Sequence, residues 1–322
     1  MKVDHSIPVS PLLRTIPFLE SAEFSPWPGR LMESDVWQKS NRTANEILKE
    51  YNEGWYEQLL ELWKVFSSSL KETGANPGAV LRFYYRVQRH IAEGVEANTA
   101  VYRTSQDNYL FSCGDEMLVG DITLGGMFHL DMIVRMLDRH LAGTSIRTVV
   151  EPGCGSGINL FHLHAYLDLD RIVGGDICAN AVLLGNQISE RLQIPGEFYH
   201  FDYSAPDSLG QMTRCLQRYA LMTCHSIEQI QLSDAVFVDR VLGLPNPPQI
   251  VMQFEPLIWE DDSLMSRLCR KYARKNRYNE DLLAVLTDRQ SQGRLTIVDC
   301  QKRCFGLSAF NPTSFVCWKP LQ

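Results

Sequence analysis

The sequence predicts a doubly wound α/β domain that follows an N-terminal helical extension. From about residue 146, apolar strand-like runs alternate with helical patterns, which is typical of a parallel sheet covered on both faces. A glycine-rich turn at 151–157 follows the first of these strands. The last two strand-like runs, 294–299 and 314–318, have no helical pattern between them, which predicts an antiparallel hairpin at the sheet edge.

The composition is that of an ordinary globular protein and excludes several classes of function. The 322 residues carry a net charge of −7, which argues against binding to duplex nucleic acid. No window offers the roughly 18 apolar residues of a membrane span, and the first residues lack the apolar core of a signal peptide. The nine cysteines are scattered without a Cys-x-x-Cys pair, which predicts reduced thiols in a cytoplasmic enzyme.

The extension reads as an arm followed by two helices. Residues 1–40 are proline-rich and predict an irregular arm that packs on the remainder through its apolar side chains. Apolar residues at three- and four-residue steps predict a helix over 43–72 and, after a turn at 74–78, a second helix. We therefore assign 1–110 to an arm and a helical lid or substrate cap. A purely structural helical hairpin is the alternative interpretation.

The α/β domain is assigned to 111–322, and its elements follow from the apolar pattern. Short β-branched runs bounded by turn residues predict seven strands, at 147–151, 171–176, 198–201, 219–224, 249–254, 294–299 and 314–318. Apolar positions at helical spacing predict helices at 158–167, 180–192, 209–218, 233–242 and 264–289, the last of them long and charged.

The glycine-rich turn Glu151-Pro152-Gly153-Cys154-Gly155-Ser156-Gly157 has the features of a ligand loop. Glycines allow close backbone approach, and the N–H groups of the following helix favour an anionic group. A dinucleotide fingerprint needs a third glycine at position 158, where Ile158 stands, and a P-loop needs a lysine that is absent. The acid Glu151 before the loop suits a ligand with an ammonium or sulfonium charge better than a pyrophosphate.

Three acids fall at the ends of successive predicted strands: Glu151, Asp176 and Asp202. The carboxyl ends of parallel strands form the edge at which α/β proteins bind ligands. Asp176 is placed to accept hydrogen bonds from both hydroxyls of a ribose, and Asp202 from an exocyclic amine of a purine. A single aspartate at such a position is more often a cap or a turn former. Three acids in register behind a glycine loop favour a binding site.

With these residues in place, the chain resembles the class I S-adenosylmethionine-dependent methyltransferases. The segment 151–157 resembles their motif I, Asp176 their ribose-binding acid, and Asp202, followed by Tyr203, their adenine-contacting acid. The terminal hairpin resembles their last two strands, of which the seventh inserts antiparallel between the fifth and sixth. The resemblance covers roughly 115–320 and implies a seven-stranded, Rossmann-like methyltransferase sheet.

The resemblance also implies the bound cofactor, S-adenosyl-L-methionine, with S-adenosyl-L-homocysteine as the product. Glu151 would lie near its amino group, and the backbone of the glycine loop would hold its methionine part. Arg103 precedes motif I and, by position alone, would pair with the cofactor carboxylate. The expected cofactor contacts are Glu151, Gly153, Cys154, Gly155, Asp176, Ile177, Asp202, Tyr203, Tyr102 and Arg103. The first 100 residues match no family pattern.

The candidate catalytic loop is Cys224-His225-Ser226-Ile227-Glu228-Gln229, after the fourth strand, which in this family lines the junction of cofactor and acceptor. His225 is the candidate general base because an imidazole titrates near neutral pH. Glu228 would orient it or bind an acceptor amine. The alternative is that His225 only contacts the cofactor or caps the next helix. Glu255, at the end of the fifth strand, would reach the acceptor, unless it is simply an acid at a helix start.

The remaining histidines predict no metal site. His162 and His164 are two residues apart on a predicted helix and so face different directions. His129 and His140 are isolated in the sequence. No cluster of histidine, cysteine and aspartate has the spacing of a zinc site.

The resemblance implies methyl transfer to an oxygen or nitrogen of a small molecule, as in natural-product biosynthesis. A peptide or protein acceptor, or a carbon acceptor such as an α-keto acid, stays open. A methyltransferase-fold partner protein without activity is the non-enzyme alternative. An NAD-dependent oxidoreductase is disfavoured by Ile158. The expected partners include no nucleic acid and no membrane, and a homodimer is left open.

Overall fold

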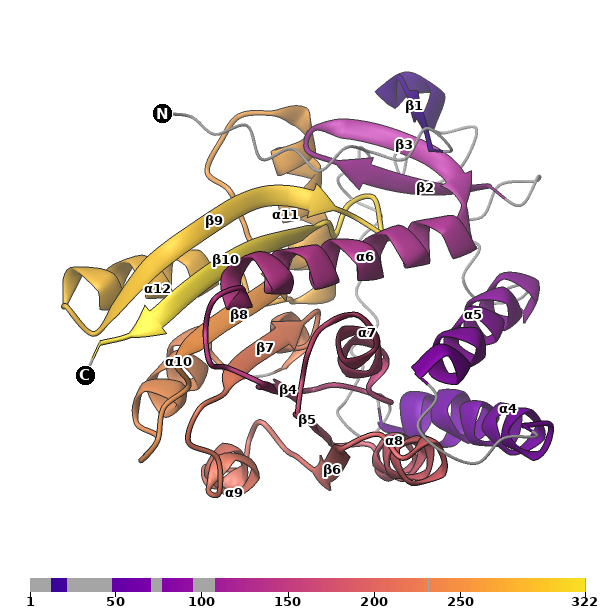
Figure 1. Ribbon diagram of the computed structural model, residues 1–322. Helices are drawn as coiled ribbons and strands as arrows, with labels where there is room; N and C mark the ends of the chain where they lie inside the picture. The colour runs from indigo at the N-terminus through magenta and orange to yellow at the C-terminus, as the bar shows by residue number, and fades with distance from the viewer. Residues whose placement is uncertain (1–12, 22–47, 71–76, 95–107, 231, 322) are drawn as a thin grey trace.

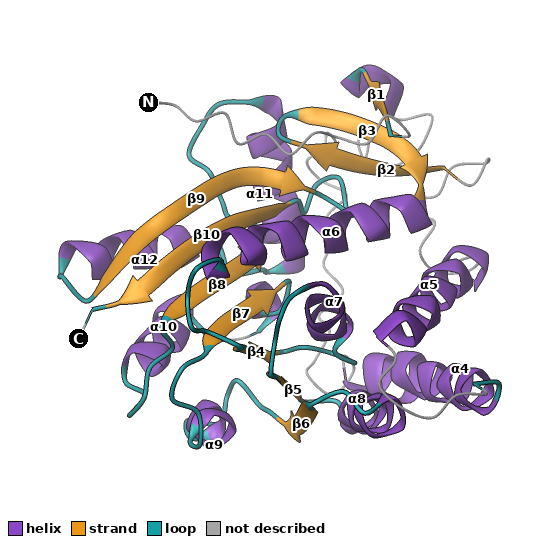
Figure 2. Ribbon diagram, in the orientation of Figure 1, coloured by secondary structure: helices purple, strands orange, loops and turns teal. Residues whose placement is uncertain are grey.

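A seven-stranded sheet forms the centre of the computed structural model, which describes residues 13–21, 48–70, 77–94, 108–230 and 232–321. The strand order is β6-β5-β4-β7-β8-β10-β9, as Figure 2 shows. The strands are β4 (Thr148–Pro152), β5 (Arg171–Asp176), β6 (Gly196–His200), β7 (Ala220–Cys224), β8 (Ile250–Glu255), β9 (Leu295–Phe305) and β10 (Thr313–Pro320). All seven correspond to predicted strands.

The first five strands run parallel, and β10 runs antiparallel to both of its neighbours, β8 and β9. This arrangement confirms the predicted doubly wound sheet with a terminal antiparallel hairpin. Because β10 is reversed, its first residues lie beside the last residues of β8, with Ser314 opposite Glu255. The carboxyl edge of the parallel strands therefore also receives side chains from the start of β10.

Helices cover both faces of the sheet (Figure 1). One face carries α6 (Ile122–Leu141), α7 (Ile158–Tyr166) and α8 (Ala179–Leu192), and the other carries α9 (Ser208–Thr213), α10 (Asp234–Leu242) and α12 (Leu282–Ser291). Successive strand residues point to opposite faces, so Met252 and Phe254 of β8 join the first core and Val251 joins the second. Burial on both faces explains why these strands are apolar throughout.

The described helices of the extension pack on the helices of the first face. They are the π-helix η2 (Lys49–Tyr56), which continues into α4 (Glu57–Ser68), and α5 (Pro77–Gly94). The rings of Trp63 and Phe83 contact each other with centroids 5.0 Å apart, which joins α4 to α5. The two predicted helices are therefore present, and the described part of the first includes a π-helical segment. Residues 43–47 and most of the predicted arm lie outside the described residues.

The sequence did not predict the small three-stranded sheet or helix α6. This sheet consists of β1 (Arg14–Ile16), β3 (Glu116–Asp121) and β2 (Asn108–Cys113), in that order. A short 3-10 turn, η1 (Phe18–Glu20), follows β1. The Asp121 side chain caps α6 by accepting from the backbone N–H of Leu124 at 3.0 Å. Strand β2 spans residue 110, where the sequence predicted the end of the extension.

The predicted long helix 264–289 is wrong, because two helices occupy this segment. Helix α11 (Leu264–Asn276) ends at Arg277, which has a φ of +51°. Asn279 then inserts its side-chain amide between neighbouring segments before α12 begins. The amide donates to the carbonyl oxygens of Ile227, Ile230 and Leu232. These tertiary hydrogen bonds compensate for the helical hydrogen bonds lost at the break. The apolar periodicity of the sequence cannot locate this break.

The predicted helix 209–218 is also too long, since α9 has only six residues. It gives way to a turn in which the backbone N–H of Leu216 donates to the Thr213 carbonyl at 2.9 Å.

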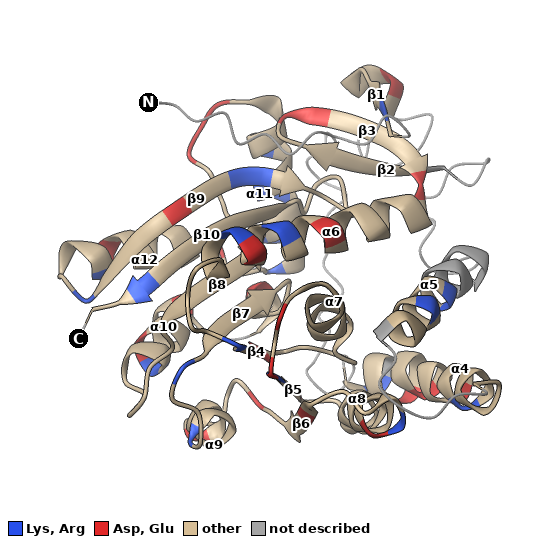
Figure 3. Ribbon diagram, viewed as in Figure 1, with Lys and Arg blue, Asp and Glu red and all other residues tan. Residues whose placement is uncertain are grey.

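Basic and acidic residues are interspersed along α6 and β9 (Figure 3). Within the described ranges, no helix combines the length and the apolar character needed to cross a bilayer.

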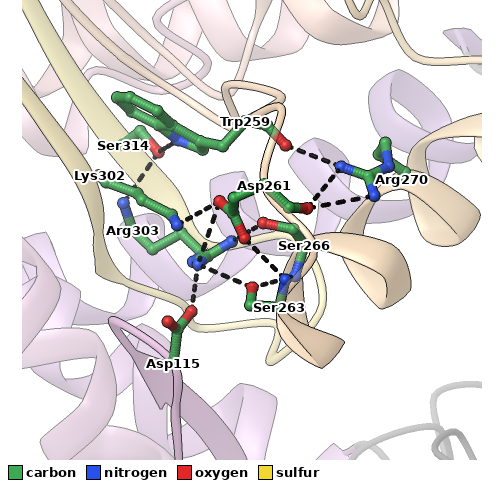
Figure 4. A network of polar contacts seen from close by, with 9 residues as sticks. All are labelled: Asp115, Trp259, Asp261, Ser263, Ser266, Arg270, Lys302, Arg303 and Ser314. Carbon is green, nitrogen blue, oxygen red and sulfur yellow. Dashed lines mark hydrogen bonds and ion pairs between the residues drawn. The ribbon is translucent and has the colours of Figure 1, made fainter.

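A polar network fixes the small sheet to the end of β9 (Figure 4). Its centre is Arg303, whose side chain is 2% exposed. The guanidinium donates to Ser266 of α11 at 2.6 Å and pairs with Asp115 in the β2–β3 turn. Asp261 accepts from Lys302 and lies 4.0 Å from the same guanidinium. The network thereby holds three segments together beside the carboxyl edge of the sheet.

Candidate functional site

The glycine loop leads from β4 into the N-terminus of α7 and crosses the carboxyl edge of the sheet. Gly153 and Gly155 have φ values of +71° and +56°, in the left-handed region that favours glycine. A Cβ on Gly153 would lie 2.6 Å from the Cβ of Ser226. The loop is therefore both bent and closely packed, as the sequence predicted.

Glu151 lies fully buried at the start of this loop. Its Oε1 accepts a hydrogen bond from Asn159 Nδ2 at 2.7 Å, and its Oε2 has no partner among the described residues. Burial raises the pKa of the Glu151 carboxyl to about 8. The hydrogen bond from Asn159 lowers this pKa, and the nearby charge of Asp176 raises it by a smaller amount. A cationic group of a ligand would satisfy the free oxygen.

Asp176 ties the glycine loop to the end of β5. Its Oδ2 accepts from the backbone N–H of Gly155 at 2.8 Å, and its Oδ1 from that of Cys178 at 2.9 Å. Burial raises the pKa of this carboxyl, and the two backbone hydrogen bonds oppose that effect. Each oxygen keeps a second lone pair, so both can still accept from the hydroxyls of a ribose. The adjacent Ile177 is 39% exposed and offers an apolar surface beside that position.

Asp202 and Tyr203 follow β6, and both make hydrogen bonds within the protein. Asp202 Oδ1 accepts from the backbone N–H and the hydroxyl of Ser204, each at 2.7 Å. These bonds form the turn that was the alternative interpretation of this acid, and a contact with adenine stays a prediction. The Tyr203 hydroxyl donates to the Pro152 carbonyl at 2.8 Å and lies 2.8 Å from Ser226 Oγ. Tyr203 thus joins three loops of the carboxyl edge.

Of three further predicted cofactor contacts, the structure describes only Cys154. The Cys154 thiol is buried below the loop, where a Cβ on Gly174 would lie 2.6 Å from it. This packing holds the Cys154 side chain inside the protein, so a ligand on the loop could contact only the Cys154 backbone. Tyr102 and Arg103 lie outside the described residues.

The extension contacts the glycine loop through residues that the sequence did not single out. The Tyr84 hydroxyl donates to the Ser156 carbonyl at 2.8 Å. The Tyr56 hydroxyl packs directly against Gly155, since a Cβ added to Gly155 would lie 2.5 Å from the hydroxyl oxygen. Asn52 Oδ1 accepts from the backbone N–H of Asn180 at 2.8 Å, at the start of α8. In the sequence these side chains are only members of helical patterns, so no local signal identified them.

The candidate catalytic residues His225, Glu228 and Glu255 lie together at the ends of β7 and β8. The His225 backbone has a φ of +47°, and its N–H donates to the Phe254 carbonyl at 3.0 Å. This bend directs the imidazole Nδ1 toward Glu228, with 3.3 Å between Nδ1 and Oε1. The His225 side chain is 26% exposed, whereas that of Glu228 is 3% exposed.

Glu228 and Glu255 form a buried carboxyl pair behind His225. Glu255 Oε1 also accepts from the backbone N–H of Ser226 at 3.3 Å. Burial and the charge of Glu228 raise the pKa of Glu255 well above its usual range. Burial also raises the pKa of Glu228, but the hydrogen bond and charge of His225 outweigh it, so that its pKa is lowered. Glu255 therefore holds a proton more strongly than Glu228 does.

His129 and Thr313 complete this group, and the sequence identified neither of them. His129 appeared isolated, but its Nε2 lies 2.9 Å from Thr313 Oγ1. The same hydroxyl oxygen lies 2.6 Å from His225 Nε2. Burial, with a smaller contribution from His225, lowers the pKa of His129 to about 3. In the described part of the chain, no three histidine, cysteine or acidic side chains are arranged to hold a metal ion.

No protein-family model and no curated protein matches the sequence. Many solved structures match the fold. A putative class I S-adenosylmethionine-dependent methyltransferase from Listeria monocytogenes is 10% identical, with a TM-score of 0.50 over 86% of this chain and 84% of that one. This likeness shows that the chain has the class I methyltransferase fold.

Two further matches are enzymes with S-adenosyl-L-homocysteine bound. A magnesium protoporphyrin IX methyltransferase from Synechocystis is 14% identical, covering 62% of this chain and 85% of that one, with a TM-score of 0.45. A geranyl diphosphate C-methyltransferase from Streptomyces coelicolor is 13% identical, covering 59% and 80%, with a TM-score of 0.43.

Proposed function

We propose that this chain, which has the class I methyltransferase fold, is an enzyme that transfers a methyl group from S-adenosylmethionine to an oxygen or nitrogen of a small molecule. The free Oε2 of Glu151 carries the proposal. A buried carboxyl group with an unpartnered oxygen is costly, and we expect the amino group of the cofactor to lie beside it.

The remaining cofactor contacts follow the carboxyl edge. The backbone of the loop from Gly153 to Gly157 would hold the methionine part, and Asp176 would accept from the ribose hydroxyls. Ile177 and Asp202 would border the adenine. When bound, the cofactor supplies an electrophilic methyl group. The protein has to align the acceptor with it and remove a proton.

His225 would accept the proton that the acceptor loses. The exposed part of its ring gives an acceptor access, and the buried Glu228 carboxylate would stabilise the positive charge on the imidazolium. Glu255, whose pKa is raised, would hold its proton and leave Glu228 as the charged partner of His225. In this arrangement Glu255 acts behind Glu228 rather than on the acceptor.

The identity of the acceptor remains a proposal. We favour a small molecule because the net charge of −7 gives no electrostatic attraction for nucleic acid. A peptide or protein acceptor, or a carbon acceptor such as an α-keto acid, would use the same base. Assay of methyl transfer from labelled S-adenosylmethionine into pools of amines, phenols, acids and peptides would separate these alternatives.

Titration calorimetry with S-adenosyl-L-homocysteine tests the cofactor site. The wild-type chain should bind it, and Glu151→Gln should weaken binding by about tenfold to a hundredfold, the scale of a lost charged hydrogen bond. Glu116→Gln is the matched control, because Glu116 is an exposed acid on β3. If the wild-type chain binds no S-adenosyl-L-homocysteine, the enzyme proposal fails and a partner protein without activity becomes the better interpretation.

A further inference from the structure

We propose that Thr313 is a positioning residue that couples the tautomers of His129 and His225 and leaves Nε2 of neutral His225 without a hydrogen. The inference deepens the proposed function, since it concerns the candidate base of that reaction. It starts from one juxtaposition, in which a single buried hydroxyl lies between two imidazole Nε2 atoms at 2.6 and 2.9 Å.

A threonine hydroxyl has one hydrogen and can therefore donate to only one of the two nitrogens. The other nitrogen must carry a hydrogen of its own and donate to Oγ1. Thr313 is fully buried, so water does not offer its hydroxyl an alternative partner. The neutral tautomer of one histidine thus determines that of the other. His129 is 6% exposed, and burial keeps it uncharged.

Glu228 determines the direction of this chain of hydrogen bonds. Glu228 Oε1 accepts from the Gln229 side-chain amide at 3.3 Å, so this oxygen is an acceptor, and the Nδ1 of His225 that faces it carries a hydrogen. In a neutral ring, Nε2 is then bare and accepts from Thr313. His129 must in turn carry its hydrogen on Nε2 and donate to Thr313. The opposite arrangement would leave only the amide of Asn311, 3.5 Å from Nδ1, as a donor to His225, with a lone pair facing the Glu228 charge.

The hydroxyl is also suited to the protonated state of His225. When Nε2 takes up a proton, Oγ1 can change from donor to acceptor by rotation of its hydrogen, without movement of the oxygen. A serine retains this property, whereas the isosteric valine provides neither a donor nor an acceptor. Thr313→Ser and Thr313→Val therefore separate the hydroxyl from the packing of the methyl group.

Long-range proton–nitrogen NMR on the full chain, labelled with nitrogen-15 in histidine, tests the coupling at a pH where both rings are neutral. Variants His129→Asn and His225→Asn assign the signals. The wild-type protein should show His225 with its hydrogen on Nδ1 and His129 with its hydrogen on Nε2. Glu228→Gln introduces an amide that can donate or accept, so His225 should populate both tautomers, and His129 should change with it.

The response of His129 to Glu228→Gln should persist with Thr313→Ser and disappear with Thr313→Val. A wild-type His225 with its hydrogen on Nε2 would overturn the inference. A change of the His129 tautomer that persists in Thr313→Val would also overturn it. So would the absence of any change at His129 when Glu228→Gln is made in the protein with Thr313. The measurement needs neither cofactor nor acceptor. Failure to bind S-adenosyl-L-homocysteine would overturn the proposed function alone, and loss of coupling with binding intact would overturn only this inference.

Discussion

The Asn159 amide nitrogen lies 2.7 Å from Oε1 of Glu151, which leaves the second oxygen of that buried carboxyl without a partner in the described structure. With a pKa of about 8, the group is neutral at pH 6.5 when no ligand is bound. An ammonium beside it would favour the ionised form. The binding of S-adenosyl-L-homocysteine should therefore release close to one proton at this pH.

Calorimetric titrations in buffers of different ionisation enthalpy measure this proton. The observed enthalpy should change with the buffer for the wild-type protein and for Glu116→Gln, and should be independent of the buffer for Glu151→Gln. An equal dependence in Glu151→Gln would show that another group supplies the proton.

His129 predicts how stability changes in acid. Its pKa is lowered from 6.5 to about 3, so the folded state holds it neutral while the unfolded chain takes up a proton. Its contribution to stability is complete above pH 6.5 and is lost as the pH falls toward 3. Between pH 7 and pH 5 the loss is about 2 kcal/mol, from about 1.4 kcal/mol per pH unit below 6.5.

Urea unfolding of the wild-type protein and of His129→Gln at pH 7 and pH 5 tests this expectation. The variant should lose less stability over the interval, by about that amount. His162, whose pKa burial also lowers, to about 4, is present in both proteins and cancels in the difference. Equal losses in the two proteins would place the acid sensitivity elsewhere.

Gly155 should tolerate alanine poorly for two separable reasons. Its φ of +56° costs a residue with a Cβ about 1–2 kcal/mol, and the Cβ would also meet the Tyr56 hydroxyl at 2.5 Å. Gly293→Ala is the matched control, since Gly293 has a φ of +69° and no atom within 4 Å of the Cβ position. Gly155→Ala should therefore destabilise the protein more than Gly293→Ala does, as measured by denaturant unfolding.

The double variant Tyr56→Phe with Gly155→Ala isolates the contact. Removing the hydroxyl leaves ring carbon Cζ as the nearest atom, 3.5 Å from the added Cβ. The double variant should recover the steric part of the loss and retain the backbone part. Strict additivity of the two changes would show that Tyr56 moves away from Gly155 without cost.

Arg303 should be more important for stability than its neighbour Lys302. The Arg303 side chain is 2% exposed and contacts Asp115, Ser266 and Asp261, whereas the Lys302 side chain is 33% exposed. Arg303→Met removes several contacts of a buried side chain at once, although Asp115, which is 57% exposed, keeps its hydration. Loss of an exposed pair costs about 0–1 kcal/mol. Thermal and denaturant unfolding of Arg303→Met and Lys302→Met should show this ranking, and similar effects would contradict it.

His225 can be tested without disturbing its backbone. Its φ of +47° is one that asparagine adopts more readily than alanine, so His225→Asn is the preferred variant. Once an acceptor is known, this change should reduce kcat by about a hundredfold, the usual scale of general-base catalysis. The Kd for S-adenosyl-L-homocysteine should stay within about twofold of the wild-type value. A normal kcat would leave His225 with a structural role.

The parallel strands could be predicted because burial on both faces makes each of them a continuous apolar run between turn residues. Glu151, Asp176 and Asp202 could be placed at one edge because parallel strands share their direction. The break at Arg277 could not be predicted, since it depends on hydrogen bonds from Asn279 to a loop some fifty residues earlier. Local periodicity contains no information on such contacts.

The group around His225 shows the same limit. Loop position identified His225 and Glu228, but Thr313 and His129 come from β10 and α6, 88 and 96 residues away in the chain. Only the reversed insertion of β10 brings Thr313 to this edge. Tyr56 and Asn52 were similarly hidden, because a tyrosine or asparagine on a helical surface gives no sign of what it will contact.

The position of β10 also has a consequence for biosynthesis. Among the seven strands of the sheet, β10 leaves the ribosome last, yet it lies between β8 and β9. Until residues 313–320 emerge, β8 is an apolar edge strand with unpaired backbone groups, and β9 has no neighbour in the sheet. The nascent protein is therefore prone to aggregation until this strand leaves the ribosome and pairs with β8 and β9, which is the stage at which a chaperone would be most useful.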